Sequence, residues 1–452
     1  MLLSKLVNRN LDTATPNRIR QIDLLRAVSI WVVVFGHILM GVVVWQPELA
    51  ITNLLAVLPS LQFLSWILQV MPVFFMAGAA ANQISYSSAR KKQMPYPIWV
   101  FNRFSRLLSP MFWYLLIIIL LSAVIGNFLP EDDLRVFLNL ATQLLWFLGI
   151  YLAMTALTPL VDWLKSRPVL VWSLLAGVAI VDLMRLQGNT PVGLLNFLAG
   201  WIFISVVGAR LPAELQVRVP KNSHIGFVLL AELLLVAFLP YPLSLVGLPG
   251  EPFSNMAPPS LLLVLHGYLF YLLWLKFSSQ LERLANRPRI WRFTLFTNLS
   301  AMTVYLWHLP IIMSTHLFLN LIGIEFSVSQ TSNDSFEISA FYAVELFCFS
   351  ALVAVLVYGF AQVAWPLEQM KVAVPKPFSN HQMRLSKALA VVGTTALSIG
   401  TLLFSVVGPA GFPNATGSFS FLSWSNGMAV ALLAVGSIAI WGGAKSAPPQ
   451  IS

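Results

Sequence analysis

The sequence has 452 residues, of which 58% are hydrophobic and only 10% are charged, and its mean hydropathy is +0.79. A chain this apolar is not a soluble globular protein, so we expect an integral membrane protein. The formal net charge of +10 does not indicate binding to nucleic acid, because the basic residues are spread over short segments between apolar runs. The single cysteine, Cys348, excludes an internal disulfide and a cysteine-based metal site, and no metal is expected.

Apolar runs of about 17 residues or more are long enough to cross a bilayer as helices. The chain contains twelve such runs, near residues 24–45, 60–84, 107–127, 138–160, 168–183, 191–208, 224–241, 260–277, 296–320, 338–364, 388–408 and 426–443. We therefore predict an all-α polytopic membrane protein with about twelve transmembrane helices. The connections between the runs are too short to hold a folded domain outside the membrane.

The charge of these connections alternates along the chain. Those after the second, fourth, sixth, eighth and tenth predicted helices are rich in Lys and Arg, whereas the intervening ones carry mainly Asp and Glu. Lys and Arg favour cytoplasmic loops, so both termini are expected in the cytoplasm. The first apolar run lacks the short core and cleavage site of a signal peptide, so it is expected to be retained as a helix.

Charge and hydrophobicity divide the chain into four expected segments. They are a cytoplasmic N-terminal segment at 1–20, a membrane domain at 21–370, a basic cytoplasmic linker at 371–387 and two additional transmembrane helices at 388–443. The last segment contains no Asp, Glu, Lys, Arg or His. These two helices are therefore expected to be an appendage to the membrane domain that contributes no ionisable residue to a functional site.

The first predicted helix carries Asp23, Arg26 and His37. Eleven residues make almost three helical turns, so Arg26 and His37 share one side of the helix about 16 Å apart along its axis. Asp23 and Arg26 are three residues apart and are expected to pair at the inner end. An ionisable group at bilayer depth is costly, which makes His37 a candidate catalytic residue. The alternative is a neutral histidine that is hydrogen-bonded to a neighbouring helix.

Two other segments contain polar pairs at helical spacing. Arg103 and Arg106 begin the third predicted helix, where an arginine pair suits phosphate binding; anchoring to anionic lipid headgroups is the alternative. Tyr305 and His308 face together on the ninth predicted helix, and His308 lies at a depth similar to that of His37. Two histidines at matching depth favour a shared polar cavity.

Further polar residues fall within other predicted helices. Glu345 and His266 each lie about two turns below the outer surface, and an outward vestibule that they line would suit an acceptor rich in hydroxyl groups. Glu232 lies near the middle of the seventh predicted helix. Hydrogen bonding to neighbouring helices is the alternative role for each of these residues.

Five segments together resemble the acyltransferase 3 family of integral-membrane acyltransferases. They are IDLLRAVSIWVVVFGH, MPVFFMAG, RFSRL, LWFLGIYL and YLWHLP, and they follow the family's order over about residues 20–365. Two departures stand out: MAGAA replaces a frequent Ser-Gly pair, and the helices after residue 387 lie outside the resemblance. The family core is described as ten helices, so the resemblance implies ten helices plus two.

The resemblance implies a membrane-bound O-acyltransferase that is located in a bacterial inner (plasma) membrane. The donor and co-substrate would be cytoplasmic acyl-CoA, with acetyl-CoA expected, and the acceptor a hydroxyl group of a saccharide or glycolipid, as in O-acetylation of a cell-envelope polysaccharide. His37 would act as general base or as acyl carrier. The expected catalytic residues are His37, Arg26, Asp23, His308 and Tyr305. Those expected to bind the coenzyme are Arg103, Arg106 and Arg26, and those expected to bind the acceptor are Glu345, His266 and Trp146.

Two interpretations from other classes stay open at this point. Twelve helices with both ends inside are also typical of secondary transporters, and a flippase or scaffold for envelope assembly has a similar layout. Some family members carry a fused domain outside the membrane that passes acyl groups on, and this chain has no segment long enough for one. If the chain is such an acyltransferase, either its membrane domain or a separate envelope partner must complete the transfer to the acceptor.

Overall fold

The computed structural model describes residues 18–45, 49–127, 130–215, 217–330, 336–368, 373, 375, 382–412, 414–419 and 422–448. Most of the predicted segment 1–20 and most of the basic linker 371–387 lie outside these residues. The described chain is mainly helical, with three short antiparallel hairpins that the sequence does not predict.

Ten helices in the described part of the chain are long and apolar enough to cross a membrane, so the protein is a polytopic membrane protein. Two of the twelve expected helices are not among these ten. Helix α12 (Asn222–Phe238) is an apolar helix of 17 residues, at the lower limit of the length that the sequence prediction used. Helix α13 (Leu261–Lys276) is followed by α14 (Ser278–Ala285) after a bend of 71°. The count of twelve spans and the cytoplasmic position of both termini stay predictions.

The chain forms two compact units, and unit 1 comprises residues 1–80 and 161–362. Its further helices are α2 (Arg20–Met40), α3 (Leu54–Val57), α4 (Leu64–Leu68), the first half of α5 (Met71–Lys91), the end of α9 (Thr158–Leu164), α10 (Pro168–Leu186), α11 (Leu194–Glu214), α15 (Pro288–Leu299), α16 (Ala301–Leu321) and most of α17 (Tyr342–Glu368). Single 3-10 turns occupy Pro59–Leu61 and Thr190–Gly193. Its strands are β1 (Gly41–Val44), β2 (Ala50–Asn53), β3 (Val328–Gln330) and β4 (Phe336–Ile338).

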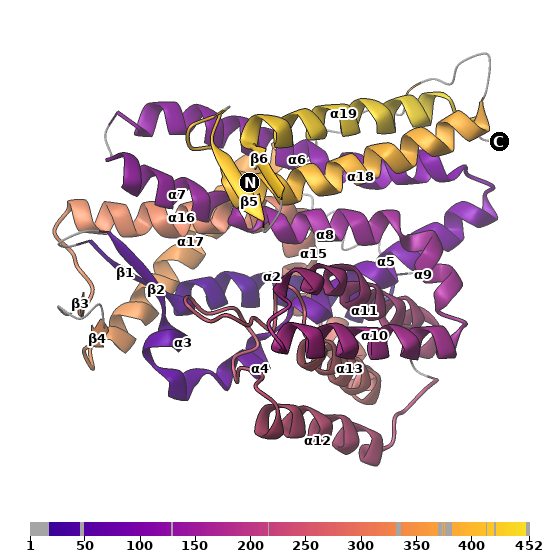
Figure 1. Ribbon diagram of the computed structural model, residues 1–452, viewed down its shortest axis with the longest axis horizontal. Helices are drawn as coiled ribbons and strands as arrows, with labels where there is room; N and C mark the ends of the chain where they lie inside the picture. The colour runs from indigo at the N-terminus through magenta and orange to yellow at the C-terminus, as the bar shows by residue number, and fades with distance from the viewer. Residues whose placement is uncertain are drawn as a thin grey trace. The chain divides into compact units, whose positions relative to one another are not determined.

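Two groups of helices organise unit 1. Helix α2 packs along α14, α15 and α16. Helices α10, α11 and α13 pack together, and α12 lies against α13 at the edge of this group (Figure 1). The hairpins β1-β2 and β3-β4 are neighbours, because β1 contacts β3.

Unit 2 comprises residues 81–160 and 363–452. Its further elements are α6 (Tyr96–Ile125), α7 (Glu131–Gln143), α8 (Leu145–Ala156), α18 (Met383–Val407), α19 (Asn426–Lys445), β5 (Thr416–Phe419) and β6 (Leu422–Ser425). Helices α18 and α19 run side by side, and within this unit α18 packs on α8 and α19 on α6 (Figure 1). A Cβ atom on Gly436 would lie only 2.7 Å from Leu397 Cγ, so glycine permits this close approach.

Several helix boundaries differ from the sequence prediction. Helix α2 ends at Met40 rather than near residue 45, because the β-branched run Val42–Val44 pairs with β2 in a hairpin. The predicted helix at 296–320 is divided at Ser300 into α15 and α16. His37 therefore lies in the last turn of α2.

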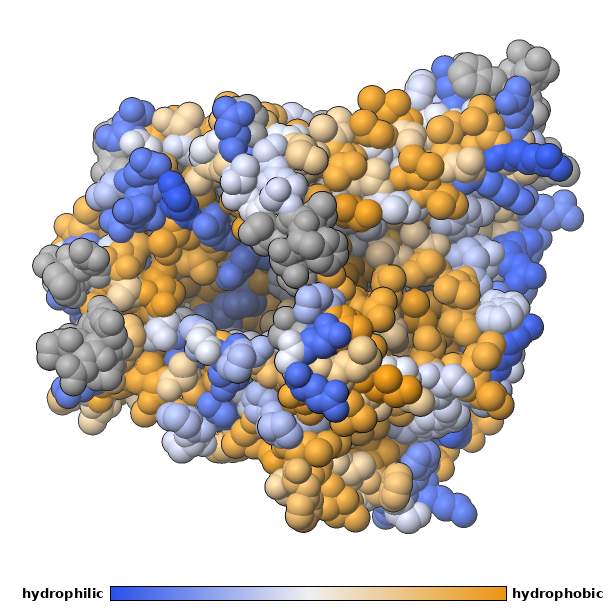
Figure 2. Space-filling model, in the orientation of Figure 1, coloured by the Kyte–Doolittle hydropathy of each residue, from blue (hydrophilic) through white to orange (hydrophobic). Residues whose placement is uncertain are grey.

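Apolar side chains cover much of the visible face of the molecule (Figure 2). Exposed apolar residues are numerous along α12, where Phe227 and Phe238 are 70% and 79% exposed. A surface of this kind requires a hydrocarbon environment rather than water.

Candidate functional site

Two histidines from different helices of unit 1 form the centre of the candidate site. His37 Nδ1 on α2 lies 3.2 Å from His308 Nε2 on α16. The ring centroids are 5.2 Å apart, and the ring planes are inclined by 40°. His308 is fully buried, whereas His37 is partly exposed. The structure thus brings together the two histidines that the sequence singled out.

The hydrogen bonds of His308 assign the protons of both rings. His308 Nδ1 lies 3.1 Å from the Val304 carbonyl oxygen, which can only accept, so this nitrogen carries a hydrogen. In the neutral ring, Nε2 is then an acceptor, and His37 Nδ1 must donate to it. This leaves Nε2 of His37 with a free lone pair. The His37 ring also has a hydrogen bond to the backbone of Val33, one helical turn earlier.

Tyr305 lies beside the histidine pair, and Arg26 lies eleven residues before His37 on the same helix. The Tyr305 ring is tilted against the His308 ring, with 6.4 Å between their centroids. Arg26 is partly buried on α2, and its guanidinium group has no ion pair or hydrogen bond within the described residues. A partly buried cation without a protein partner is suited to bind an anionic group.

The predicted pair between Asp23 and Arg26 is wrong. Asp23 Oδ2 instead lies 3.3 Å from Arg18 Nε, just ahead of α2. The carbonyl oxygen of Asp23 accepts a hydrogen bond of 2.8 Å from Asn298 Nδ2 on α15. Arg18 precedes the helix and pairs with the Asp23 carboxylate. The Arg26 side chain therefore does not pair with Asp23.

Helix α15 holds α2 in place through residues that the sequence analysis missed. Trp31 Nε1 donates to Thr297 Oγ1 at 3.0 Å, and the Arg20 guanidinium group lies 4.7 Å from the centroid of the Trp291 ring. Together with the Asn298 bond, these contacts hold the part of α2 that precedes His37. Thr297 and Asn298 lie at the start of the helix predicted at 296–320. The structure instead places them in α15, which is separated from α16 at Ser300.

Arg103 and Arg106 belong to unit 2 and have different surroundings. Arg103 donates through Nε and Nη2 to Asn82 Oδ1, with an Nε distance of 3.0 Å. Asn82 Nδ2 in turn donates to Thr155 Oγ1 at 3.1 Å, which links α6, α5 and α8. Arg106 is exposed. Trp146 on α8 is half-buried, and its ring meets that of Phe147 edge to face.

His266 and Glu345 use their polar atoms on protein partners. His266 Nδ1 lies 3.2 Å from Glu232 Oε2, and its Nε2 lies 2.8 Å from the Trp66 carbonyl oxygen. Glu345 accepts hydrogen bonds from the backbone N–H and the hydroxyl group of Ser327, at 2.8 and 2.5 Å. The two residues therefore have separate hydrogen-bond partners, and Glu232 is a partner of His266.

A buried carboxylate that sequence reasoning missed ties α10 to the segment 239–260 and to α13. Asp182 accepts hydrogen bonds from Arg185 Nη1, Asn196 Nδ2, the Tyr241 hydroxyl group and the Leu261 N–H, at 2.7, 3.0, 3.0 and 2.6 Å. Burial, and next the Asp182 charge, raises the pKa of Tyr241, so its hydroxyl group stays protonated and donates. Four donors satisfy this carboxylate, which indicates a structural role.

Within the described residues, no group of three or more His, Cys, Asp or Glu side chains is placed to hold a metal ion. Residues 19–361, more than half of the chain, match a family model described as an acyltransferase domain. No curated protein and no solved structure matches the chain. The matched region contains both histidines of the pair and ends before α18.

Proposed function

Because the chain belongs to the acyltransferase 3 family and is therefore a membrane acyltransferase, we propose that it transfers an acyl group from acyl-CoA to a hydroxyl group of a saccharide or glycolipid. Acetyl is the expected acyl group. The observation that carries this proposal is the free lone pair on His37 Nε2, which the hydrogen bond to His308 creates. The family match favours acyl transfer over the transporter and flippase alternatives.

In the general-base route, His37 Nε2 accepts the proton of the acceptor hydroxyl group. The acceptor oxygen then bonds to the thioester carbonyl carbon, the carbon–sulfur bond breaks, and the proton passes from the imidazolium to the departing thiolate. In the acyl-carrier route, Nε2 itself bonds to the thioester carbonyl carbon, and the carbon–sulfur bond breaks to release the thiolate. The acyl group then moves from the imidazole to the acceptor oxygen, the nitrogen–acyl bond breaks, and the hydroxyl proton passes to the thiolate. Both routes need the same unprotonated nitrogen, so both stay part of the proposal.

His308 is proposed as a positioning residue. Its Nε2 accepts from His37 Nδ1, which fixes the tautomer and the orientation of the His37 ring. Its own ring is fixed by the bond to the Val304 carbonyl. Tyr305, next to this pair, is proposed to polarise the thioester carbonyl.

Arg26 is proposed to bind an anionic group of the donor, since it is partly buried and has no protein partner within the described residues. Arg103 and Arg106 are proposed to bind phosphate groups of the coenzyme. Arg106 is exposed and suited to this role, whereas Arg103 is already hydrogen-bonded to Asn82. Asp23 is proposed to act indirectly, through the ion pair of its carboxylate with Arg18 at the start of α2.

Trp146 is proposed to stack on a sugar ring of the acceptor, because its aromatic ring is half-buried rather than enclosed. His266 and Glu345 are bonded to protein groups, so they are not part of this proposal. The proposed location is the inner membrane of a bacterium, with donor binding on the cytoplasmic side.

The test uses the purified protein in nanodiscs with radiolabelled acetyl-CoA. We expect His37→Gln to lower the release or transfer of label by about 10²–10⁴-fold while acetyl-CoA still binds, because the base or carrier is lost. His316→Gln is the matched control: His316 is a buried histidine of α16 whose ring packs against Phe326 and Phe349. It should keep most of the activity.

Three outcomes decide between the parts of the proposal. Full activity in His37→Gln would reject the role of His37. Failure of the parent protein to bind acetyl-CoA would reject the donor. Label that stays covalently attached to the parent protein without acceptor, and is lost in His37→Gln, would select the acyl-carrier route.

A further inference from the structure

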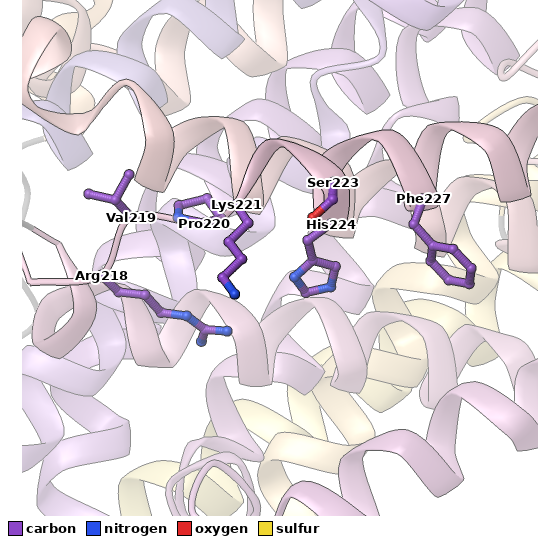
Figure 3. A pocket seen from close by; sticks show the side chains of 7 residues that line it. All are labelled: Arg218, Val219, Pro220, Lys221, Ser223, His224 and Phe227. Atoms are coloured by element: carbon purple, nitrogen blue, oxygen red, sulfur yellow. The ribbon is translucent and has the colours of Figure 1, made fainter.

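A surface cavity of about 550 Å³ lies in unit 1 where α12 begins. Its lining comes from residues of the segment 218–227. Figure 3 shows Lys221, His224 and Phe227 projecting from the same side of α12, with the Arg218 side chain extending toward Lys221. The proposed acyl transfer uses none of these residues.

The cavity has an excess of positive charge. Arg218 is paired with Glu214, 2.9 Å away, and the same carboxylate accepts from the Tyr271 hydroxyl group. Lys221 is exposed, and its ammonium group has no partner within the described residues. The single carboxylate therefore balances one of two neighbouring cations.

The start of α12 increases this excess. Lys221 is the N-cap residue, and no side chain caps the helix. The amino-terminal end of a helix carries a partial positive charge, so a cation is unfavourable there and an anion is favourable. His224 completes the lining with a ring that lies beside Tyr268, with 5.8 Å between the centroids. The cavity is thus lined by the cations Arg218 and Lys221, the uncapped start of α12 and the imidazole ring of His224.

An apolar stripe continues from the cavity along the outside of α12. Phe227, Leu230, Leu234 and Phe238 are all exposed, and their spacing of three or four residues places them on one side of the helix. Glu232 is fully buried and faces His266 of α13, so this stripe is the side of α12 turned away from α13. The cavity is thus polar and cationic at one end and opens onto an extended apolar surface.

We propose that this cavity binds the phosphodiester headgroup of an anionic phospholipid, whose acyl chains lie along the apolar stripe of α12. The excess cation and the uncapped helix end favour a headgroup with a net negative charge over a zwitterionic headgroup, whose own cation balances its phosphate. The apolar stripe favours a lipid over free phosphate, because a single lipid molecule contacts both the cationic cavity and the stripe that continues from it. Phe227 marks the junction between headgroup and chains.

The test titrates the full-length protein in detergent with dioleoyl phosphatidylglycerol or dioleoyl phosphatidylcholine and counts bound lipid by native mass spectrometry. We expect Lys221→Gln to weaken phosphatidylglycerol binding about fivefold and to leave phosphatidylcholine binding unchanged. Arg289→Gln is the matched control, since Arg289 is an exposed cation in the first turn of α15. It should change neither affinity.

A second variant separates the lipid from free phosphate. Phe227→Ser should weaken phosphatidylglycerol binding, because the acyl chains lose a contact at the mouth of the cavity. Inorganic phosphate should displace the lipid from the parent protein only weakly. Equal effects of Lys221→Gln and Arg289→Gln would reject a defined site in favour of general surface charge. Strong displacement by inorganic phosphate, with Phe227→Ser behaving as the parent, would assign the cavity to free phosphate.

Discussion

At the scale of single residues, the contact between His37 and His308 gives two chemically identical side chains different properties. The Val304 carbonyl fixes the tautomer of His308, and His308 then fixes that of His37. One ring is fully buried, and the other is partly exposed with an unprotonated nitrogen. Hydrogen-bond donation thus runs in one direction, from His37 on α2 through His308 to the Val304 carbonyl on α16.

This direction predicts that the acceptor atom at position 308 matters more than the ring. His308→Gln places an amide oxygen near the position of Nε2, so we expect kcat within about tenfold of the parent. His308→Leu removes the acceptor and should lower kcat about a hundredfold, because His37 loses its tautomer control. Steady-state kinetics with acetyl-CoA provides the measurement, and KM for acetyl-CoA should stay constant.

Equal losses of kcat in the two variants would contradict the tautomer argument. A rise in KM with constant kcat would instead place His308 in donor binding. Thermal unfolding of both variants controls for a loss of folded protein.

The sequence indicated His37 and His308 because ionisable groups in apolar helices are rare and need partners. It did not indicate Thr297 or Asn298, which hold α2 from α15, since small polar residues at a helix end have many ordinary roles. The partner of Asp23 was predicted as Arg26, because helical spacing describes only pairs within one helix. Arg18 lies outside the helix, where spacing gives no information.

At the scale of elements, hydrophobic length predicts where helices occur but not where they bend. The run at 296–320 is apolar enough overall to predict one helix, yet it divides at Ser300. The turn from α13 to α14, and the three hairpins, depend on how neighbouring segments pack. Strand formation depends strongly on the packing around a segment, so local composition does not reveal these features.

Contacts distant in sequence also predict the effect of two glycine substitutions. A Cβ atom on Gly149 of α8 would lie 2.7 Å from Leu402 Cγ and 3.0 Å from the Ser398 carbonyl oxygen of α18. Gly149→Ala should therefore lower the free energy of unfolding by about 1–3 kcal/mol through overpacking. Gly177→Ala in α10 is the control, because nothing lies within 4 Å of its Cβ position.

We expect Gly177→Ala to be neutral or stabilising by less than about 1 kcal/mol, since alanine favours a helix. Thermal unfolding at one heating rate in identical nanodiscs compares the two variants with the parent. If Gly149→Ala matched Gly177→Ala, α18 would not pack on α8 as closely as described.

At the scale of the whole molecule, the alternation of basic and acidic connections predicts one orientation in the membrane. Arg167 lies in a connection expected in the cytoplasm, and Glu251 lies in one expected on the opposite side; both residues are exposed. Replacing the single cysteine by Cys348→Ser provides a cysteine-free background. We expect Glu251→Cys to react with a membrane-impermeant maleimide in intact cells, and Arg167→Cys only after the membrane is opened.

The reverse labelling would show that the termini lie outside. Labelling of both positions in intact cells would mean that an even number of membrane crossings separates them, instead of the three that the sequence predicts. The twelve-segment prediction would then need revision in the region of α10 to α12.

The carboxylate of Asp182 also has a consequence for the biosynthesis of the protein. Its last donor, the Leu261 N–H, lies 79 residues further along the chain. At ~5–20 residues per second, the ribosome reaches this residue roughly 4–16 s after Asp182. During that interval α10 carries a carboxylate that still lacks its bonds to Tyr241 and Leu261. We therefore expect α10 to remain beside the insertion machinery until α13 begins to emerge, so that these helices enter the lipid as a group rather than one at a time.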